Sequence, residues 1–75
     1  MSLNRSAGAA GILVNGEPRE VPAGTTVEDV VALLASSGRG IAVALNGEVV
    51  PRSEWRRTRL EAGDRVEVLS AAQGG

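Results

Sequence analysis

The chain has 75 residues, contains no cysteine and no histidine, and balances eight arginines against nine acidic residues for a net charge of −1. This composition excludes a disulfide, a thiolate nucleophile, a histidine base and the commonest metal ligands, so we expect one small domain that is not an enzyme and binds no metal or cofactor. The charge balance and the single aromatic residue, Trp55, argue against nucleic-acid binding. The sequence has no apolar run of ~20 residues and no signal-peptide pattern, so we expect a cytoplasmic protein without membrane contact.

The first part of the chain predicts a leader followed by a β-hairpin. Residues 1–11 are small and polar without a periodic pattern, which is typical of a disordered leader. Ile12-Leu13-Val14 is a short apolar run, and Asn15-Gly16 directly after it is a strong hairpin signal. The returning strand is expected at Arg19-Glu20-Val21, between two prolines.

A helix is expected to begin at one of two adjacent threonines. With Thr26 as N-cap, Asp29 takes the third helical position, and with Thr25 as N-cap, Glu28 completes a capping box instead. The spacing of the apolar residues predicts one buried stripe formed by Val27, Val30, Val31 and Leu34. Gly38, after two serines, is a natural residue to end the helix.

The second half predicts three more strands and a charged connection. Ile41–Leu45 reads as a strand, and Asn46-Gly47 turns the chain into a short strand, Glu48–Val50. The charged segment 52–59 is compatible with one helical turn, and Leu60 is expected to fill the core from a loop. A strand over Arg65–Ser70 follows.

This order of elements predicts an α+β fold with a mixed sheet of about four to five strands and one helix on one face. The first and last long strands are apolar enough to be central neighbours in the sheet. Trp55 is interpreted as covering the edge of the core rather than as a binding hot spot. The arginines around it are interpreted as a solvated loop rather than as a surface that steers an acidic partner: Arg52, Arg56, Arg57 and Arg59.

The last strand leads into a short tail that ends on two glycines. By alternation Val66 and Val68 face the core, so Leu69 faces outward and is a candidate contact for a docking partner. The tail, Ala71-Ala72-Gln73-Gly74-Gly75, can reach about 16 Å at roughly 3.3 Å per residue. Glycine has no Cβ, so such an end can enter a narrow channel. Small residues are also common in poorly ordered termini, so the ending alone leaves both interpretations open.

Several stretches together resemble the ThiS family of sulfur carriers in thiamine biosynthesis. They are Asn15-Gly16-Glu17, Gly24-Thr25-Thr26-Val27, the run VALNGEVVPRSEW at 43–55, Gly63-Asp64-Arg65-Val66-Glu67-Val68 and Gln73-Gly74-Gly75. The resemblance implies a ubiquitin-like β-grasp domain over residues 12–70 and a flexible tail over 71–75. One departure is Ala71-Ala72, where the family usually has a branched apolar residue before the glutamine.

What the resemblance implies about chemistry is specific. Gly75 would be adenylated with ATP by an E1-like enzyme, converted to a thiocarboxylate with the help of a sulfur-donating enzyme, and used as sulfur donor by thiazole synthase. The four preceding residues would occupy the partner's channel: Gly74, Gln73, Ala72 and Ala71. ATP would be used by the partner and not held by this chain.

Two alternatives stay open at this point. The first is a sulfur carrier of another pathway, like the small subunit of molybdopterin synthase, although such carriers reach the diglycine through a proline-bearing and more apolar tail. The second is a plain ubiquitin-like interaction module, for which the free carboxyl terminus would be irrelevant.

Overall fold

The computed structural model of the chain describes residues 8–34 and 40–70. In these ranges the chain forms, in order, β1 (Ala9–Val14), β2 (Glu17–Pro22), the helix α2 (Val27–Leu34), β3 (Ile41–Leu45), β4 (Glu48–Val49), the 3₁₀ helix η1 (Arg52–Arg57) and β5 (Arg65–Ser70). The strands make one five-stranded sheet in the order β2-β1-β5-β3-β4. β1 and β5 are parallel, whereas the other neighbouring pairs are antiparallel. The predicted α+β class and the central pairing of the first and last strands are confirmed.

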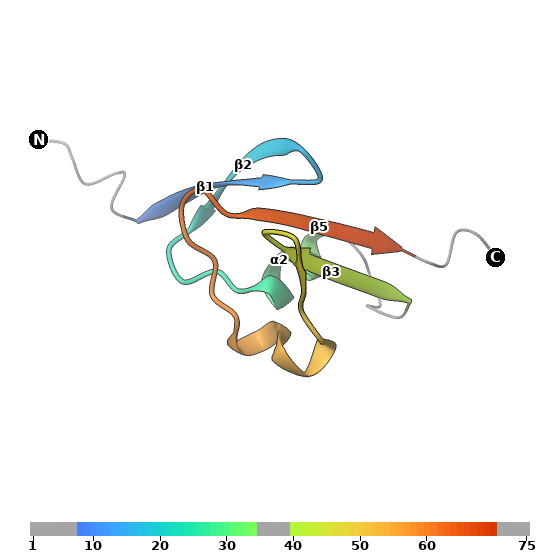
Figure 1. The fold of residues 1–75 in the computed structure, drawn as a ribbon. Helices are drawn as coiled ribbons and strands as arrows, with labels where there is room; N and C mark the ends of the chain where they lie inside the picture. The colour runs from blue at the N-terminus through green and yellow to red at the C-terminus, as the bar shows by residue number, and fades with distance from the viewer. Residues whose placement is uncertain (1–7, 35–39, 71–75) are drawn as a thin grey trace, which may run out of the picture.

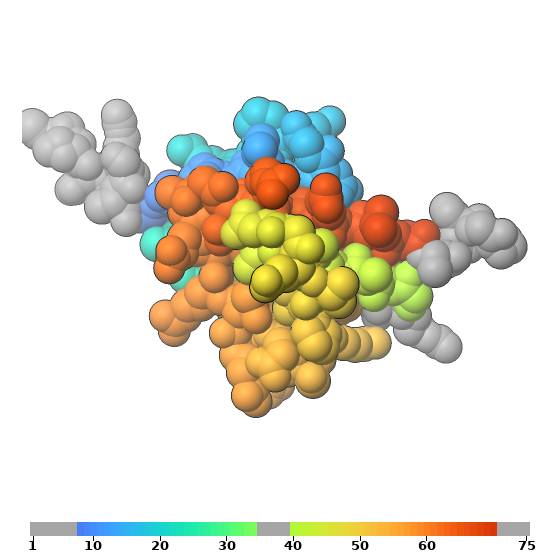
Figure 2. Space-filling view, in the orientation of Figure 1, coloured from blue at the N-terminus to red at the C-terminus, as the bar shows by residue number. Residues whose placement is uncertain are grey.

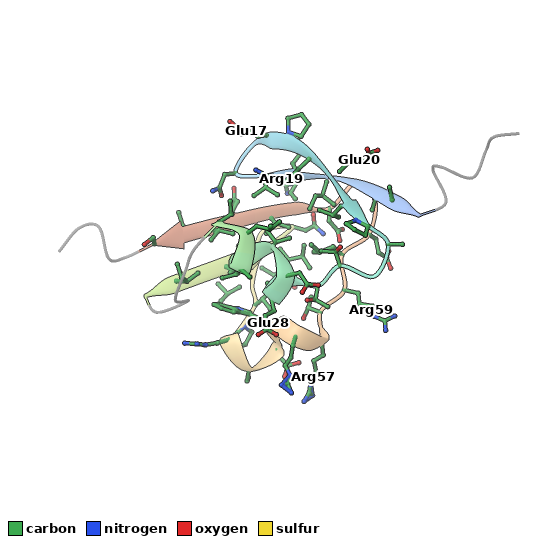
Figure 3. The ribbon with its side chains drawn as sticks, turned by 180° about the vertical axis from the view of Figure 1, so that it is seen from behind. Glu17, Arg19, Glu20, Glu28, Arg57 and Arg59 are labelled. Carbon is green, nitrogen blue, oxygen red and sulfur yellow. The ribbon has the colours of Figure 1, made fainter. Side chains whose placement is uncertain are left out.

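The sheet has one covered face and one open face. The buried side chains of α2 belong to the same core as those of β1, β3 and β5. In Figure 3 α2 lies in front of the sheet, and in Figure 1, seen from the other side, it lies behind it. Figure 1 also shows β5 between β1 and β3, running on past the β1–β2 turn.

The first hairpin is longer than its sequence pattern predicts. β1 begins at Ala9, so the expectation of a leader over residues 1–11 is wrong for positions 9–11, and residues 1–7 lie outside the described part of the chain. Ala10 is buried opposite Val21, and the amide of Ala23 donates to the carbonyl of Gly8 at 3.0 Å. Alanine and glycine have low strand propensity, so this end of β1 exists because β2 pairs with it.

β2 tolerates two prolines because it is an edge strand. The strand spans Glu17–Pro22 rather than the predicted three residues. Pro18 pairs with Leu13 and Pro22 pairs with Ala9, so the prolines occupy alternate positions of the same parity. Proline has no N–H, and these positions place the nitrogen on the side of the strand away from β1, where no ladder bond is lost.

The helix takes the first of the two predicted starts. The Asp29 amide donates to Thr26 Oγ1 at 3.2 Å, and the Thr26 amide donates to Asp29 Oδ2 at 3.0 Å, which is a capping box with Thr26 as N-cap. Val27, Val30 and Val31 are buried as predicted, but Leu34 is 42% exposed. Leu34 is the last residue of α2, so the buried stripe ends before the helix does. The predicted helix end near Gly38 lies outside the described residues.

The connection between β4 and β5 contributes two buried residues to the core. Trp55 in η1 is 4% exposed, and its Nε1–H donates to the carbonyl of Val50 at 2.9 Å. Leu60 is also buried, and its amide donates to the carbonyl of Thr25 at 2.8 Å, which ties this segment to the start of α2. The predicted roles of Trp55 and Leu60 as core residues are therefore confirmed.

Candidate functional site

Among the residues predicted to carry function, the structure describes Leu69, in β5. The covalent site Gly75 and the channel residues Gly74, Gln73, Ala72 and Ala71 lie outside the described residues, so their roles stay predictions. β5 ends at Ser70, directly before them. The geometry of this strand therefore sets where the predicted tail begins.

Side chains of β5 alternate between the core and the open face as predicted. Val66 is 1% exposed, whereas Leu69 is 66% exposed. Glu67, of the same parity as Leu69, is also exposed. The outward direction of Leu69 is therefore confirmed, and a leucine this exposed next to the tail contributes nothing to the core.

Leu69 belongs to an apolar area on the open face, which we call the outer patch: Ala42, Ala44, Val49 and Leu69. Leu69 pairs with Ala42 across β5 and β3, and Ala44 pairs with Val49 across β3 and β4. Directly paired residues share a face of the sheet, and Val49 is 77% exposed. Figure 2, seen from the side away from α2, shows β5 as a band between the β1–β2 hairpin and β3–β4. The patch lies beside the end of β5 from which the tail departs.

The two asparagine-glycine turns both reach β5, which turn chemistry alone does not predict. Asn15 and Asn46 have φ values of 52° and 51°, as such turns require. The Asn15 side chain accepts from the Val68 amide at 2.8 Å and donates to the Val68 carbonyl at 3.3 Å. The Asn46 side chain accepts from the Arg65 amide at 2.8 Å and donates to the Asp64 carboxylate at 3.0 Å. Each turn therefore anchors a different end of β5.

The four arginines near Trp55 are all exposed, as expected for a solvated segment. Arg52 lies over the Trp55 ring, with its guanidinium carbon 5.6 Å from the ring centroid. Arg57 and Glu54 make an exposed ion pair at 3.9 Å. Figure 3 shows Arg57 and Arg59 on the η1 side of the molecule, opposite the hairpin that carries Glu17 and Glu20. Because Trp55 is buried, it offers no exposed ring to a partner.

The described residues hold no group of three or more potential metal ligands. Neither α2 nor η1 has the length and apolar run that would be needed to cross a membrane. What the described residues do offer is a strand that is bonded to β3 and to two asparagine side chains, and an apolar patch beside it.

Comparisons with known proteins agree with this description. The model of the ThiS family matches residues 12–75. The sulfur carrier protein ThiS of Escherichia coli is 31% identical over 64 residues, which cover 85% of this chain and 97% of that protein. ThiS of Thermus thermophilus is 38% identical over the same share of this chain and 98% of its own length. A thiazole synthase of Paramagnetospirillum magneticum is 34% identical over 64 residues, but there the chain spans only 20% of the relative's length.

A solved structure supports the fold independently. The crystal structure of the thiamine biosynthesis protein ThiS from Geobacter metallireducens superimposes with a TM-score of 0.71 at 33% identity, covering 80% of this chain and 91% of that one. The fold is thus the ubiquitin-like β-grasp that the resemblance implied. With the family model and two relatives matched over nearly their full length, this chain belongs to the ThiS family of sulfur carrier proteins.

Proposed function

We propose that this chain is the cytoplasmic sulfur carrier for thiazole formation in thiamine biosynthesis, with the carboxylate of Gly75 as the carrier group. The family match over residues 12–75, together with two sulfur carriers matched over 97% and 98% of their own length, is the observation that carries the proposal. That match includes the terminal Gly74-Gly75. The relatives named above belong to thiamine biosynthesis or thiazole formation, which favours this pathway over molybdopterin synthesis.

The proposed reaction has two steps at one carboxyl group. A Gly75 carboxylate oxygen attacks the α-phosphate of ATP in an E1-like enzyme, pyrophosphate leaves, and an acyl-adenylate forms. Hydrosulfide released by a sulfur-donating enzyme then attacks the carbonyl carbon, the bond from that carbon to the AMP phosphate oxygen breaks, and AMP leaves. The product is a thiocarboxylate, in which one oxygen is replaced by sulfur. Every catalytic group belongs to the partners, consistent with a chain that has neither cysteine nor histidine.

Thiazole synthase is the proposed acceptor of the sulfur. Two thiazole synthases each contain a segment that matches this chain and makes up 20% of their length. A carrier-like segment inside a thiazole synthase supports the idea that the two proteins act on one substrate in sequence. We propose that the outer patch, with Leu69 as its member on β5, is the surface on which the adenylating enzyme docks.

The experiment combines intact-mass measurement with two variants. The chain is incubated with ATP, a sulfide source and an E1-like enzyme that adenylates Escherichia coli ThiS, which serves as positive control. We expect one oxygen to be replaced by sulfur in the parent, and no such product after deletion of Gly75 or in Gly74→Val. A valine next to the reacting carbon adds a branched side chain and restricts backbone dihedrals where the carboxylate must align with ATP.

The control in this experiment is that both variants remain folded. Both variants change residues beyond the end of β5, so their circular dichroism spectra are expected to match the parent. Thiocarboxylate formed at the parental rate by Gly74→Val, or adenylation of the chain that lacks Gly75, would contradict the proposal. Adding thiazole synthase or the large subunit of molybdopterin synthase to the loaded carrier then distinguishes the two pathways.

A further inference from the structure

The carboxyl-terminal half of β5 has a strand on only one of its sides. On the β1 side the ladder stops at the pair Val14 and Val66. On the β3 side pairing continues to Ile41 and Ser70. From Val68 onward, within the part of the chain that the structure describes, β3 is therefore the only strand that holds β5. This is the stretch that leads directly into the carrier tail.

At Val68 the side chain of Asn15 makes the hydrogen bonds that a neighbouring strand would otherwise make. The Asn15 backbone amide donates to the Val66 carbonyl at 2.9 Å, which continues the β1 ladder into the turn. The Asn15 side-chain oxygen then accepts from the Val68 amide at 2.8 Å, and the side-chain nitrogen donates to the Val68 carbonyl at 3.3 Å. A primary amide has the same donor and acceptor as a peptide group, so one residue supplies a further rung of the ladder.

The turn itself does not explain why asparagine stands at this position. Its φ of 52° is available to glycine, which would complete the same type of turn. Aspartate would also tolerate this conformation, but its carboxylate would accept from the Val68 amide and repel the Val68 carbonyl. Of these three residues, only asparagine satisfies both backbone groups of Val68.

Asn46 provides a comparison, because it is an asparagine in an equivalent turn whose side chain bonds the other end of β5. It has nearly the same φ and also stands before a glycine, but its side chain bonds Arg65 and Asp64 at the start of β5. Val68, in contrast, lies two residues before the end of the strand at Ser70. The two asparagines therefore form a matched pair, and only Asn15 acts close to the tail.

We propose that Asn15 is a positioning residue for the carrier reaction: by holding Val68, it sets the path of Leu69 and Ser70 and thus the direction in which residues 71–75 leave the sheet. This inference rests on the proposed carrier function. The terminal carboxylate must align with ATP in another protein while the outer patch is docked. A misplacement of about 1 Å can lower a rate by ~10²-fold, so the departure angle of the tail matters for catalysis.

The test compares Asn15→Gly with Asn46→Gly. Both variants keep a residue suited to positive φ and remove one side-chain anchor of β5. The E1-like enzyme that adenylates Escherichia coli ThiS is used with ATP, and kcat and KM are measured by pyrophosphate exchange. Hydrogen exchange of individual amides and urea unfolding are measured on the same proteins. Asn15→Asp is the third variant, since it retains the acceptor for the Val68 amide and loses the donor.

We expect Asn15→Gly to lose hydrogen-exchange protection at Val68 and to lower kcat by roughly tenfold, below the ~10²-fold of a full misplacement. KM should change less than kcat, because three of the four residues of the outer patch lie on β3 and β4 and do not depend on Asn15. Asn46→Gly should lose protection at Arg65 and keep the parental kcat at a similar urea midpoint. Asn15→Asp should fall between Asn15→Gly and the parent in kcat.

Three outcomes would overturn the inference. The first is equal kcat for Asn15→Gly and Asn46→Gly at matched stability, which would give Asn15 a structural role only. The second is unchanged protection of Val68 in Asn15→Gly. The third is that the parent chain is not adenylated although Escherichia coli ThiS is. This outcome would contradict the proposed function and the inference together. It is distinguished from the first two because it is seen in the unmutated chain.

Discussion

At the scale of single residues, the exposed fraction of a side chain shows whether it can contact a partner or packs in the core. Leu69 on the open face and Leu33 on α2 are almost equally exposed, at 66% and 63%. They project from different faces of the molecule, because α2 covers the face of the sheet opposite the outer patch. This pair makes it possible to test docking with substitutions that have the same chemistry and similar exposure.

We predict that Leu69→Glu weakens binding to the adenylating enzyme roughly tenfold, about 1.4 kcal/mol, because a carboxylate would be desolvated in an apolar contact. The free energy of unfolding should change by no more than about 0.5 kcal/mol, as is usual for exposed positions. Titration calorimetry and urea unfolding measure the two quantities. Leu33→Glu is the control and should bind as the parent does. Equal weakening by both substitutions would show that the outer patch is not the docking surface.

At the scale of elements, the sheet protects its two edges in different ways. β4 is only two residues long and leaves little to pair with. β2 is six residues long, and the outward-facing nitrogens at positions 18 and 22 belong to proline. Edges of this length otherwise invite strands from other molecules, and proline is one of the standard ways to prevent such pairing. The two prolines therefore make the edge of β2 a poor template for an added strand.

We predict that replacing both Pro18 and Pro22 by valine keeps the fold and increases self-association, because two outward N–H donors are restored on a strand of high β-propensity. Sedimentation velocity at increasing protein concentration measures the effect. Pro51→Val is the control: Pro51 has extended dihedrals that valine adopts and lies outside the sheet. A double variant that associates no more than the parent and Pro51→Val would show that the prolines do not protect this edge.

At the scale of the whole molecule, one aromatic side chain connects the layers. Trp55 lies in η1, bonds the Val50 carbonyl, and belongs to the same buried cluster as α2 and the central strands. η1 and α2 also contact each other, and the amide of Val27 donates to the carbonyl of Thr58 at 2.9 Å. A domain of this size has one small core, so the loss of its largest side chain should affect the entire fold.

We predict that Trp55→Ala costs about 3–5 kcal/mol of unfolding free energy, a large share of the ~5–15 kcal/mol typical of a domain. Trp55→Phe keeps most of the apolar contact but loses the bond to Val50, so it should cost more than about 1 kcal/mol and less than the alanine variant. Urea unfolding followed by circular dichroism measures both, since fluorescence is lost with the tryptophan. Near-parental stability of Trp55→Ala would place this residue outside the core.

Local patterns in the sequence were sufficient for much of this protein. The two asparagine-glycine turns and the outward parity of Leu69 were predicted, and the helix start was narrowed to Thr25 or Thr26, because each depends on residues only a few positions apart. The interpretation of Trp55 as a residue that covers the edge of the core agrees with its burial. The carrier function came from resemblance across the chain, including the terminal Gly74-Gly75, and the family match agrees with it.

Only the tertiary structure decided how the ends of the strands are held. Ala9 became a strand residue because β2 lies beside it, and Leu34 became exposed because the core ends before α2 does. The bond between Asn15 and Val68 joins residues 53 positions apart. It exists because β1 and β5 are parallel neighbours and β5 is the longer at that end of the pair, a relation that no local pattern contains.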